Sequence, residues 1–182
     1  MAQQLLPLPL LLLLLPLGGA LVVTAPAAIK GLRVAAQPAD FGFEMDASAV
    51  RGPLRQPLDA WACTVLAHGS MQGQVALVRR GKCTFHLKAV NLLAAGASAM
   101  VVMNNVDGPL FSMTDDSQTP VQQPSMLISK ADGEMLLGHI KETAAASGEL
   151  VEVALSLVCQ TFYSDGVVHS CSSNHLADKL VD

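Results

Sequence analysis

The sequence predicts a mixed α/β domain that is rich in β-strand, and three observations support this prediction. The first is a strand, helix and strand order, because two aliphatic runs of strand length flank a segment with helical spacing. These segments are Val75 to Arg79, Lys88 to Ala95 and Met100 to Met103. Further short apolar runs on both sides are the second observation, and a second helical pattern after Ser129 is the third. The central order predicts a crossover between parallel strands, with the helix covering one face of the sheet.

The chain begins with a leucine-rich run, Leu5 to Leu17, which only proline interrupts. It is shorter than the roughly 20 residues of a membrane span, and its length suits the apolar part of a signal peptide. Small residues at the end of this segment predict cleavage after Ala20. Small residues also allow a cut after Ala25 or Ala27, but that cut would discard Leu21 to Thr24, which we predict as the first strand.

The remaining strands and loops are predicted from composition. A second apolar stretch covers Lys30 to Ala36, whereas Glu44 to Ala60 carries proline, glycine and scattered charge and predicts a surface loop. A polar loop is predicted from Val106 to Gln123. A short strand at Pro124 to Ser129 and a closing strand at Leu150 to Cys159 are rich in aliphatic residues.

Both predicted helices carry start and stop signals. Thr84 and Ser129 are residue types that cap helix N-termini with a side-chain oxygen. Gly96 and Gly148 stand where a glycine commonly closes the C-terminus. The sequence therefore predicts two helices of defined length.

Residues at intervals of three and four define the face that each helix is expected to pack on the sheet. These are Phe85, Ala89, Leu92, Leu93 and Gly96 in the first helix, and Leu136, Leu137, Ile140 and Ala144 in the second. On the first helix, Lys88 and Asn91 are then predicted to point outward.

The central segment ALVRRGKCTFHLKAVNLLAAGASAMVVMNN resembles the centre of a protease-associated (PA) domain. That family has an apolar strand, Arg-Gly-x-Cys-x-Phe, a helix containing lysine, an Ala-Gly-Ala turn and a second strand that ends in asparagine. The matching residues are Arg80, Gly81, Cys83, Phe85, Lys88, Ala95, Gly96, Ala97, Asn104 and Asn105. An Asp-Phe-Gly-Phe sequence at residues 40–43 extends the resemblance towards the N-terminus.

The resemblance implies one PA domain at residues 21–159, a curved mixed β-sheet or open β-barrel flanked by two α-helices. Residues 1–20 are then the signal peptide and residues 160–182 a C-terminal tail. The expected function is a non-catalytic module that recruits a protein or an extended peptide in the secretory pathway or outside the cell. The alternative is that the chain is the separated PA portion of a larger secreted protease of the subtilisin type, or of a luminal glycosidase.

The four cysteines are expected to form disulfides, because secreted chains fold under oxidising conditions. Four cysteines allow three pairings. We prefer Cys63 with Cys83, since they precede and follow the first crossover strand and many PA domains carry cysteines at similar places. Cys159 and Cys171 would then form a second bridge that tethers the tail.

Composition and motifs argue against an enzyme, a metal site and a nucleic-acid partner. The net charge of −4 lacks the basic excess that nucleic acids require, and the zinc-peptidase, nucleophile-elbow and phosphate-loop motifs are missing. Asp115 and Asp116 lack the alternating oxygen ligands of a calcium loop. His169, Cys171 and His175 have no tight cysteine pair nearby, so we favour a tail loop over zinc. No cofactor is expected, and no membrane insertion after signal cleavage.

The turn after the first crossover strand is the candidate binding site. Arginine presents a planar fork to carboxylates and carbonyls, and a glycine lets another backbone approach closely. The resemblance implies a role in holding peptide for this turn, and the loop after the second crossover strand starts at the same edge. The candidate residues are Arg80, Gly81, Lys82, Asn104, Asn105 and Asp107. The competing interpretation is a solvated turn whose arginine pairs with a nearby acid.

Overall fold

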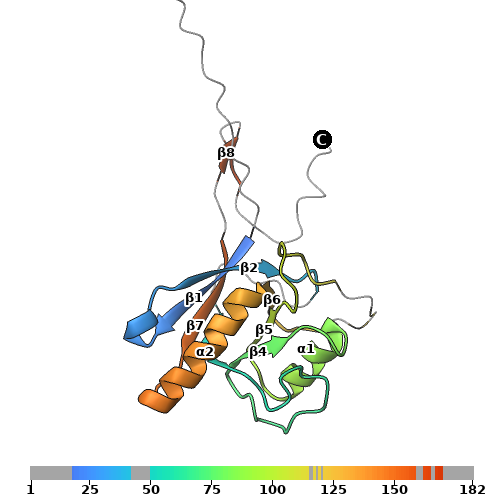
Figure 1. The fold of residues 1–182 in the computed structure, drawn as a ribbon. Helices are drawn as coiled ribbons and strands as arrows, with labels where there is room; N and C mark the ends of the chain where they lie inside the picture. Colours follow the sequence, from blue (N-terminus) through green and yellow to red (C-terminus); the bar gives the residue numbers. More distant parts are fainter. Residues whose placement is uncertain are drawn as a thin grey trace, which may run out of the picture.

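Seven β-strands form a closed barrel in the computed structural model, which describes residues 18–41, 50–114, 117, 119, 121–158, 162–164 and 167–169. The strand order is β1-β2-β6-β5-β4-β3-β7. The strands are β1 (Gly18–Ala25), β2 (Arg33–Pro38), β3 (Val50–Arg55), β4 (Val75–Arg79), β5 (Ala99–Met103), β6 (Ser125–Ile128) and β7 (Glu152–Val158). The predicted β-rich α/β class is confirmed, and the sheet closes on itself rather than leaving an open edge (Figure 1).

The two helices lie over different parts of this barrel (Figure 1). Helix α1 (Phe85–Ala94) connects β4 to β5, and these strands pair in parallel as the crossover predicted. Helix α2 (Lys130–Ala146) connects β6 to β7. Thr84 and Ser129 cap the two N-termini as predicted, because each hydroxyl accepts a hydrogen bond from a backbone amide in the first turn, at 3.2 and 3.0 Å. A short 3-10 helix, η1 (Ala27–Ile29), connects β1 to β2.

The predicted surface loop at 44–60 is wrong at residues 50–55, because these residues form β3, whereas residues 56–60 contain no helix or strand and residues 44–49 lie outside the described ranges. This strand pairs antiparallel with β7 and parallel with β4, and Leu54 is buried in the barrel. Gly52 looks like a turn residue in the sequence, yet a Cβ atom at this position would lie 2.7 Å from the carbonyl oxygen of Gly73. The glycine therefore permits a close backbone approach within the barrel, a tertiary requirement that local composition does not reveal.

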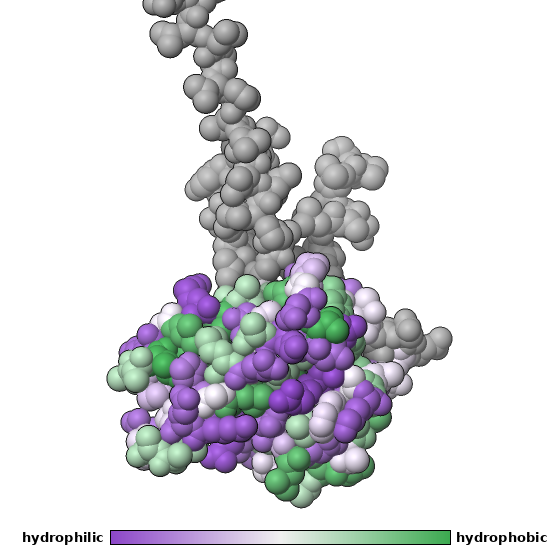
Figure 2. Space-filling model, in the orientation of Figure 1, coloured by the Kyte–Doolittle hydropathy of each residue, from purple (hydrophilic) through white to green (hydrophobic). Residues whose placement is uncertain are grey.

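Two apolar clusters fill the inside of the barrel and the space under α1. Alternation divides β4 between them: Val75 and Leu77 belong to the inner cluster, and Ala76 and Val78 to the cluster under α1. Strands covered on both faces are apolar throughout for this reason. Hydrophilic residues cover much of the face drawn in Figure 2, as expected when the large apolar side chains are gathered inside.

Helix α2 contributes Leu136 and Leu137 to the inner cluster, and Ile140 packs against it. Gly133 lies against β5, where an added Cβ would fall 2.3 Å from the Cβ of Met103. Ala144, which the helical pattern placed on the same face, is exposed instead and lies in the last turn of the helix.

The chain ends bear on three predictions. Strand β1 already begins at Gly18, and Ala20 pairs with residues of β2 and β7, while cleavage after Ala20 stays a prediction. Two short strands, β8 (Phe162–Ser164) and β9 (Val167–His169), pair with each other within the predicted tail.

Cys159 and Cys171 lie outside the described residues, so their pairing stays a prediction. Within the described ranges, no helix combines the length and apolarity needed to cross a bilayer.

Candidate functional site

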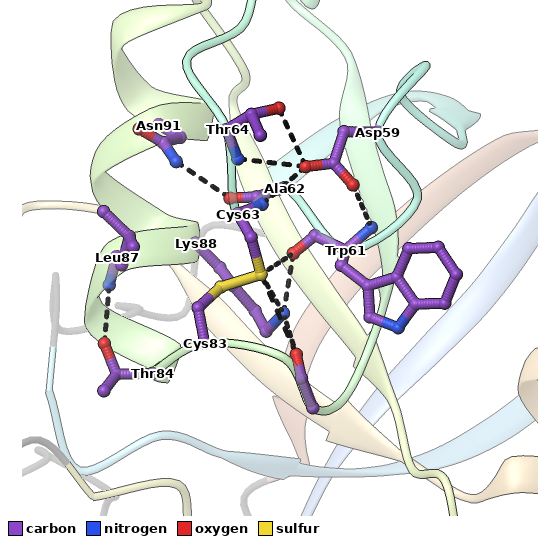
Figure 3. Close-up of a disulfide and its surroundings, with 11 residues drawn as sticks. Asp59, Trp61, Ala62, Cys63, Thr64, Cys83, Thr84, Leu87, Lys88 and Asn91 are labelled. Atoms are coloured by element: carbon purple, nitrogen blue, oxygen red, sulfur yellow. Dashed lines mark hydrogen bonds between the residues drawn. A yellow bond between two sulfur atoms is a disulfide. The ribbon is translucent and has the colours of Figure 1, made fainter.

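A disulfide between Cys63 and Cys83 joins the loop before β4 to the segment before α1, which confirms the predicted pair (Figure 3). The Cα atoms are 5.8 Å apart. The bridge therefore ties the loop at 59–64 to the turn at 80–83, two segments that approach each other only in the folded chain.

The carboxylate of Asp59 fixes the conformation of the loop at 59–64, which carries Cys63. It accepts hydrogen bonds from the backbone amides of Trp61, Cys63 and Thr64 at 3.0, 2.8 and 2.9 Å, and from the Thr64 hydroxyl at 2.9 Å (Figure 3). Burial alone raises the pKa of Asp59, but these hydrogen bonds outweigh it and lower the pKa below its ordinary value. The loop is thus built around a charged acceptor.

Lys88 was predicted to point outward from α1, and this prediction is wrong. Its side chain is fully buried, and Nζ donates to the carbonyl oxygens of Trp61 and Gly81 at 2.6 and 2.8 Å, with the Sγ of Cys63 at 3.5 Å. Figure 3 shows the ammonium group between the loop and the turn that the disulfide connects. The side chain of one helix residue thereby binds both segments.

Asn91, one turn further along α1, is also buried against the same loop. Its Nδ2 donates to the Ala62 carbonyl at 2.9 Å. Leu93, which we predicted to pack on the sheet, is 44% exposed. The helical pattern failed here because the loop covers the polar side of α1. Backbone carbonyl oxygens accept hydrogen bonds from the Lys88 amine and the Asn91 amide, so both polar groups can be buried.

Burial has a clear effect on the acidity of Lys88. Removal from water, opposed by the charge of Asp59 and assisted by that of Lys82, lowers the pKa of Lys88 from its ordinary 10.5 to about 8. Two carbonyl oxygens and one sulfur atom are fixed partners in a site removed from bulk water, so they stabilise the ammonium group less completely than full hydration does.

A cleft of about 320 Å³ opens at the carboxyl ends of β4 and β5. Its lining residues are Trp61, Arg79, Arg80, Gly81, Lys82, Asn104 and Asn105. Five of the six candidate residues named from the sequence therefore line one cleft. Asp107 is absent from its walls and is exposed in the loop that follows.

Parallel pairing explains why Arg80 meets Asn104. Arg79 is opposite Met103 in the β4–β5 register, so the next residue of each strand emerges at the same edge. The Nη1 atom of Arg80 donates to Oδ1 of Asn104 at 2.8 Å, and the guanidinium carbon lies 4.7 Å from the centroid of the Phe111 ring. Among the described residues, an amide and an aromatic ring hold this arginine, and none of the acids there pairs with it as the competing interpretation required.

The turn places Lys82 over an aromatic ring. Gly81 and Lys82 both have positive φ, at 102° and 66°, and this left-handed turn reverses the chain after β4. The Lys82 ammonium lies 3.3 Å from the centroid of the Trp61 ring, a cation–π contact. The place of Trp61 in the cleft depends on the loop that Asp59 and the disulfide hold.

Metal ligands do not gather in the described part of the chain: no three His, Cys, Asp or Glu residues there could hold an ion together. The side chains weighed for calcium and zinc, those of Asp115, Asp116, His169, Cys171 and His175, lie outside what the structure describes.

The fold and the turn agree with one known family. The family model described as "PA domain" matches residues 23–136, which include the barrel strands from β2 to β6 and both sides of the cleft. The chain belongs to the PA-domain family. The PA resemblance seen in the central segment is thereby confirmed.

Relatives of this PA domain have different overall activities. ER degradation-enhancing alpha-mannosidase-like protein 3 of Homo sapiens is 30% identical over 131 residues, which cover 66% of this chain and 14% of that protein. Vacuolar-sorting receptor 3 of Arabidopsis thaliana is 32% identical over 153 residues, which cover 74% of this chain and 23% of the receptor. The chain therefore spans less than a quarter of the length of these two relatives.

Solved structures show the same fold beside a catalytic function. BSAP, a zinc aminopeptidase from Bacillus subtilis, superposes with a TM-score of 0.56 at 26% sequence identity, covering 76% of this chain and 29% of that chain. Regions similar to this PA domain thus occur in proteins named as a mannosidase-like protein, a sorting receptor and an aminopeptidase.

Proposed function

We propose that this PA domain is a non-catalytic module that recruits a protein by binding an extended peptide segment in the cleft. The observation that carries the proposal is the convergence of Arg80, Gly81 and Asn104 with Trp61 on one cleft at the ends of two adjacent parallel strands. Ligands commonly bind at the carboxyl ends of parallel strands, where loops follow a rigid sheet.

The groups on the cleft wall suit a polypeptide main chain. Asn105 offers both an amide donor and a carbonyl acceptor, and Gly81 has no side chain to keep a second backbone away. Arg80 adds donors that are already positioned by Asn104 and Phe111. Such preorganisation reduces the entropy lost when a ligand binds.

The relatives support recruitment more than catalysis. The shared region is a small part of proteins whose names describe a mannosidase-like protein and a sorting receptor, so the activity of each is not a property common to the PA domain. The Cys63–Cys83 disulfide supports folding outside the reducing cytosol, in the secretory pathway or beyond the cell.

The second candidate is the PA portion of a larger secreted protease or luminal glycosidase. The observation that favours it is the short span of the relatives that this chain covers. Full-length transcript sequencing tests it. A reading frame that continues past Asp182 into a catalytic domain would establish this candidate, and a stop codon after Asp182 would remove it.

The binding function is tested by selecting peptides from a displayed library against the secreted, disulfide-bonded full chain. We expect selected peptides to lose about tenfold or more in affinity when Arg80→Ala is introduced. Arg33→Ala is the matched control, because Arg33 is an exposed arginine of β2 outside the cleft lining. Failure to select any peptide that depends on Arg80 would contradict the proposal.

A further inference from the structure

We propose that the cleft recognises an acidic stretch of polypeptide, so that carboxylates of the ligand bind the cations of the turn. This inference rests on the proposed peptide-binding function and names the chemical class of the ligand. It follows from the charges on the cleft wall, from their partners and from the way they are held.

The cleft is basic in a chain that is acidic overall. Three of its seven lining residues are the cations Arg79, Arg80 and Lys82, and none is an acid. The whole chain carries a formal net charge of −4. A concave site with charge of one sign focuses its field on ligands of the opposite sign.

These cations lack carboxylate partners within the described ranges. No ion pair involves Arg79, Arg80 or Lys82 there, and the ion pair that is present joins His139 and Glu142 on α2 at 3.7 Å. Asp59, the acid of the adjacent loop, already accepts four hydrogen bonds from its own loop. The charge of the cleft is therefore available to a ligand.

Two of the cations are positioned without being neutralised. Arg80 contacts the Phe111 ring and an amide oxygen, and Lys82 contacts the Trp61 ring. Aromatic rings and amides orient a cation but leave its net charge intact. A carboxylate that approached this cleft would meet donors already in place, in a geometry that guanidinium groups favour for carboxylates.

A polypeptide source of the anion is favoured over a free ion. The cleft holds about 320 Å³, far more than a single small anion occupies, and the Asn105 side chain offers a donor and an acceptor to main-chain groups beside the cations. The cations then bind side-chain carboxylates of the ligand while the rest of the wall binds its backbone.

The test uses four probes with the full chain: a capped peptide rich in Glu and Asp, its Gln and Asn counterpart of equal length, that neutral peptide carrying phosphoserine, and inorganic phosphate. Fluorescence anisotropy measures binding of the labelled peptides. Emission of Trp61, the only tryptophan, reports occupancy by the unlabelled probes. We expect the acidic peptide to bind roughly tenfold or more tightly than the neutral one, since hydrogen bonds to charged groups contribute more.

Variants connect this preference to the cleft. Arg80→Gln and Lys82→Gln should each reduce the preference for the acidic peptide, whereas Arg33→Gln, which changes net charge equally, should leave it intact. Lys82 is exposed, so its variant keeps the test valid if Arg80→Gln fails to fold. Higher salt should weaken acidic-peptide binding, because the screening length falls from about 10 Å at 0.1 M to about 3 Å at 1 M.

The outcomes separate this inference from the proposed function. Equal binding of the acidic and neutral peptides would overturn the acidic preference but leave peptide binding standing. Tighter binding of the phosphoserine peptide, or of phosphate alone, would replace the carboxylate as the recognised group and overturn the inference. Absence of acidic-peptide binding would overturn it as well, while failure of the library selection would remove both proposals.

Discussion

The two helices of this PA domain are attached to the same barrel by different chemistry. Helix α2 is held by apolar contacts, with Leu136 and Leu137 in the inner cluster. Helix α1 also buries apolar residues, but it is connected to the neighbouring loop through Lys88 and Asn91, beside the Cys63–Cys83 disulfide. Apolar contacts stabilise the fold but impose little directional constraint. Hydrogen bonds have a defined geometry, so together with the disulfide they fix the positions of individual loop residues.

This difference explains why the cleft lies on the α1 side. Trp61 and Gly81, on opposite segments of the cleft wall, both have their carbonyl oxygens bound by the same ammonium group. A binding site needs such positions held closely, while a scaffold needs only stability. Damage to the α2 side should therefore lower stability in general, and damage to the α1 side should also alter the cleft.

The largest effect is expected on the α2 side. Leu136→Ala removes a fully buried side chain and should lower the free energy of unfolding by about 3.5 kcal/mol. Urea denaturation followed by circular dichroism measures it. Leu58→Ala, at a fully exposed leucine, is the control and should change stability by less than about 0.5 kcal/mol. Equal losses of unfolding free energy in the two variants would contradict the burial of the Leu136 side chain.

Removal of the disulfide should have the next largest effect. The cysteines are 20 residues apart in sequence, and a loop of this length corresponds to about 3 kcal/mol of stabilisation. The double variant Cys63→Ala with Cys83→Ala should show this loss in urea and a changed Trp61 emission in the folded state. Unaltered emission would show that the loop keeps its position without the bridge, and the contrast between the two helices would then be weaker.

Lys88→Met should destabilise the protein by about 2 kcal/mol at neutral pH, because it removes the amine that donates to two partly buried carbonyl oxygens. Lys141→Met is the matched control, since Lys141 is exposed on α2. Urea denaturation compares the two variants. If Lys88→Met costs no more than Lys141→Met, the hydrogen bonds of the buried amine do not hold the loop.

The effect that is smallest per pH unit is a pH dependence of stability that belongs to Lys88. Its pKa is about 8 in the folded protein and 10.5 ordinarily, so between these values the unfolded chain holds a proton that the folded chain has released. Raising the pH through this window therefore favours the folded state, by at most about 1.4 kcal/mol per pH unit. The stability difference between the native protein and Lys88→Met should grow from pH 8 to 10.5. A stability difference that stays constant over this pH range would show that the Lys88 amine is hydrated and keeps its ordinary pKa.

Local sequence predicted the parts of the fold that depend on neighbours along the chain. Strand-length apolar runs, the caps at Thr84 and Ser129 and the glycine after α1 all act within a few residues, and each was found where predicted. Residues directly after two adjacent parallel strands must share an edge, so Arg80 and Asn104 could also be brought together from sequence.

The failures have a common physical origin in contacts between distant segments. Strand β3 contains Gly52 and Pro53, which favour turns locally, but pairing with β4 and β7 outweighs that preference. Lys88 is charged and would be expected in water, yet carbonyls of residues 61 and 81 provide its partners. Trp61 gave no local sign that a lysine of the opposite segment would lie over its ring.

The sequence by itself therefore indicated the PA family and the crossover, favoured the Cys63–Cys83 pair among three possible pairings, and supplied five of the seven residues around the cleft. It did so because periodicity, capping and motif order are properties of short segments. Only the tertiary structure decided that the barrel closes, that Lys88 is buried and that Trp61 lines the same cleft as cations that have no carboxylate partner among the described residues. Each of these depends on which backbone groups of remote segments become available as partners once the chain has folded.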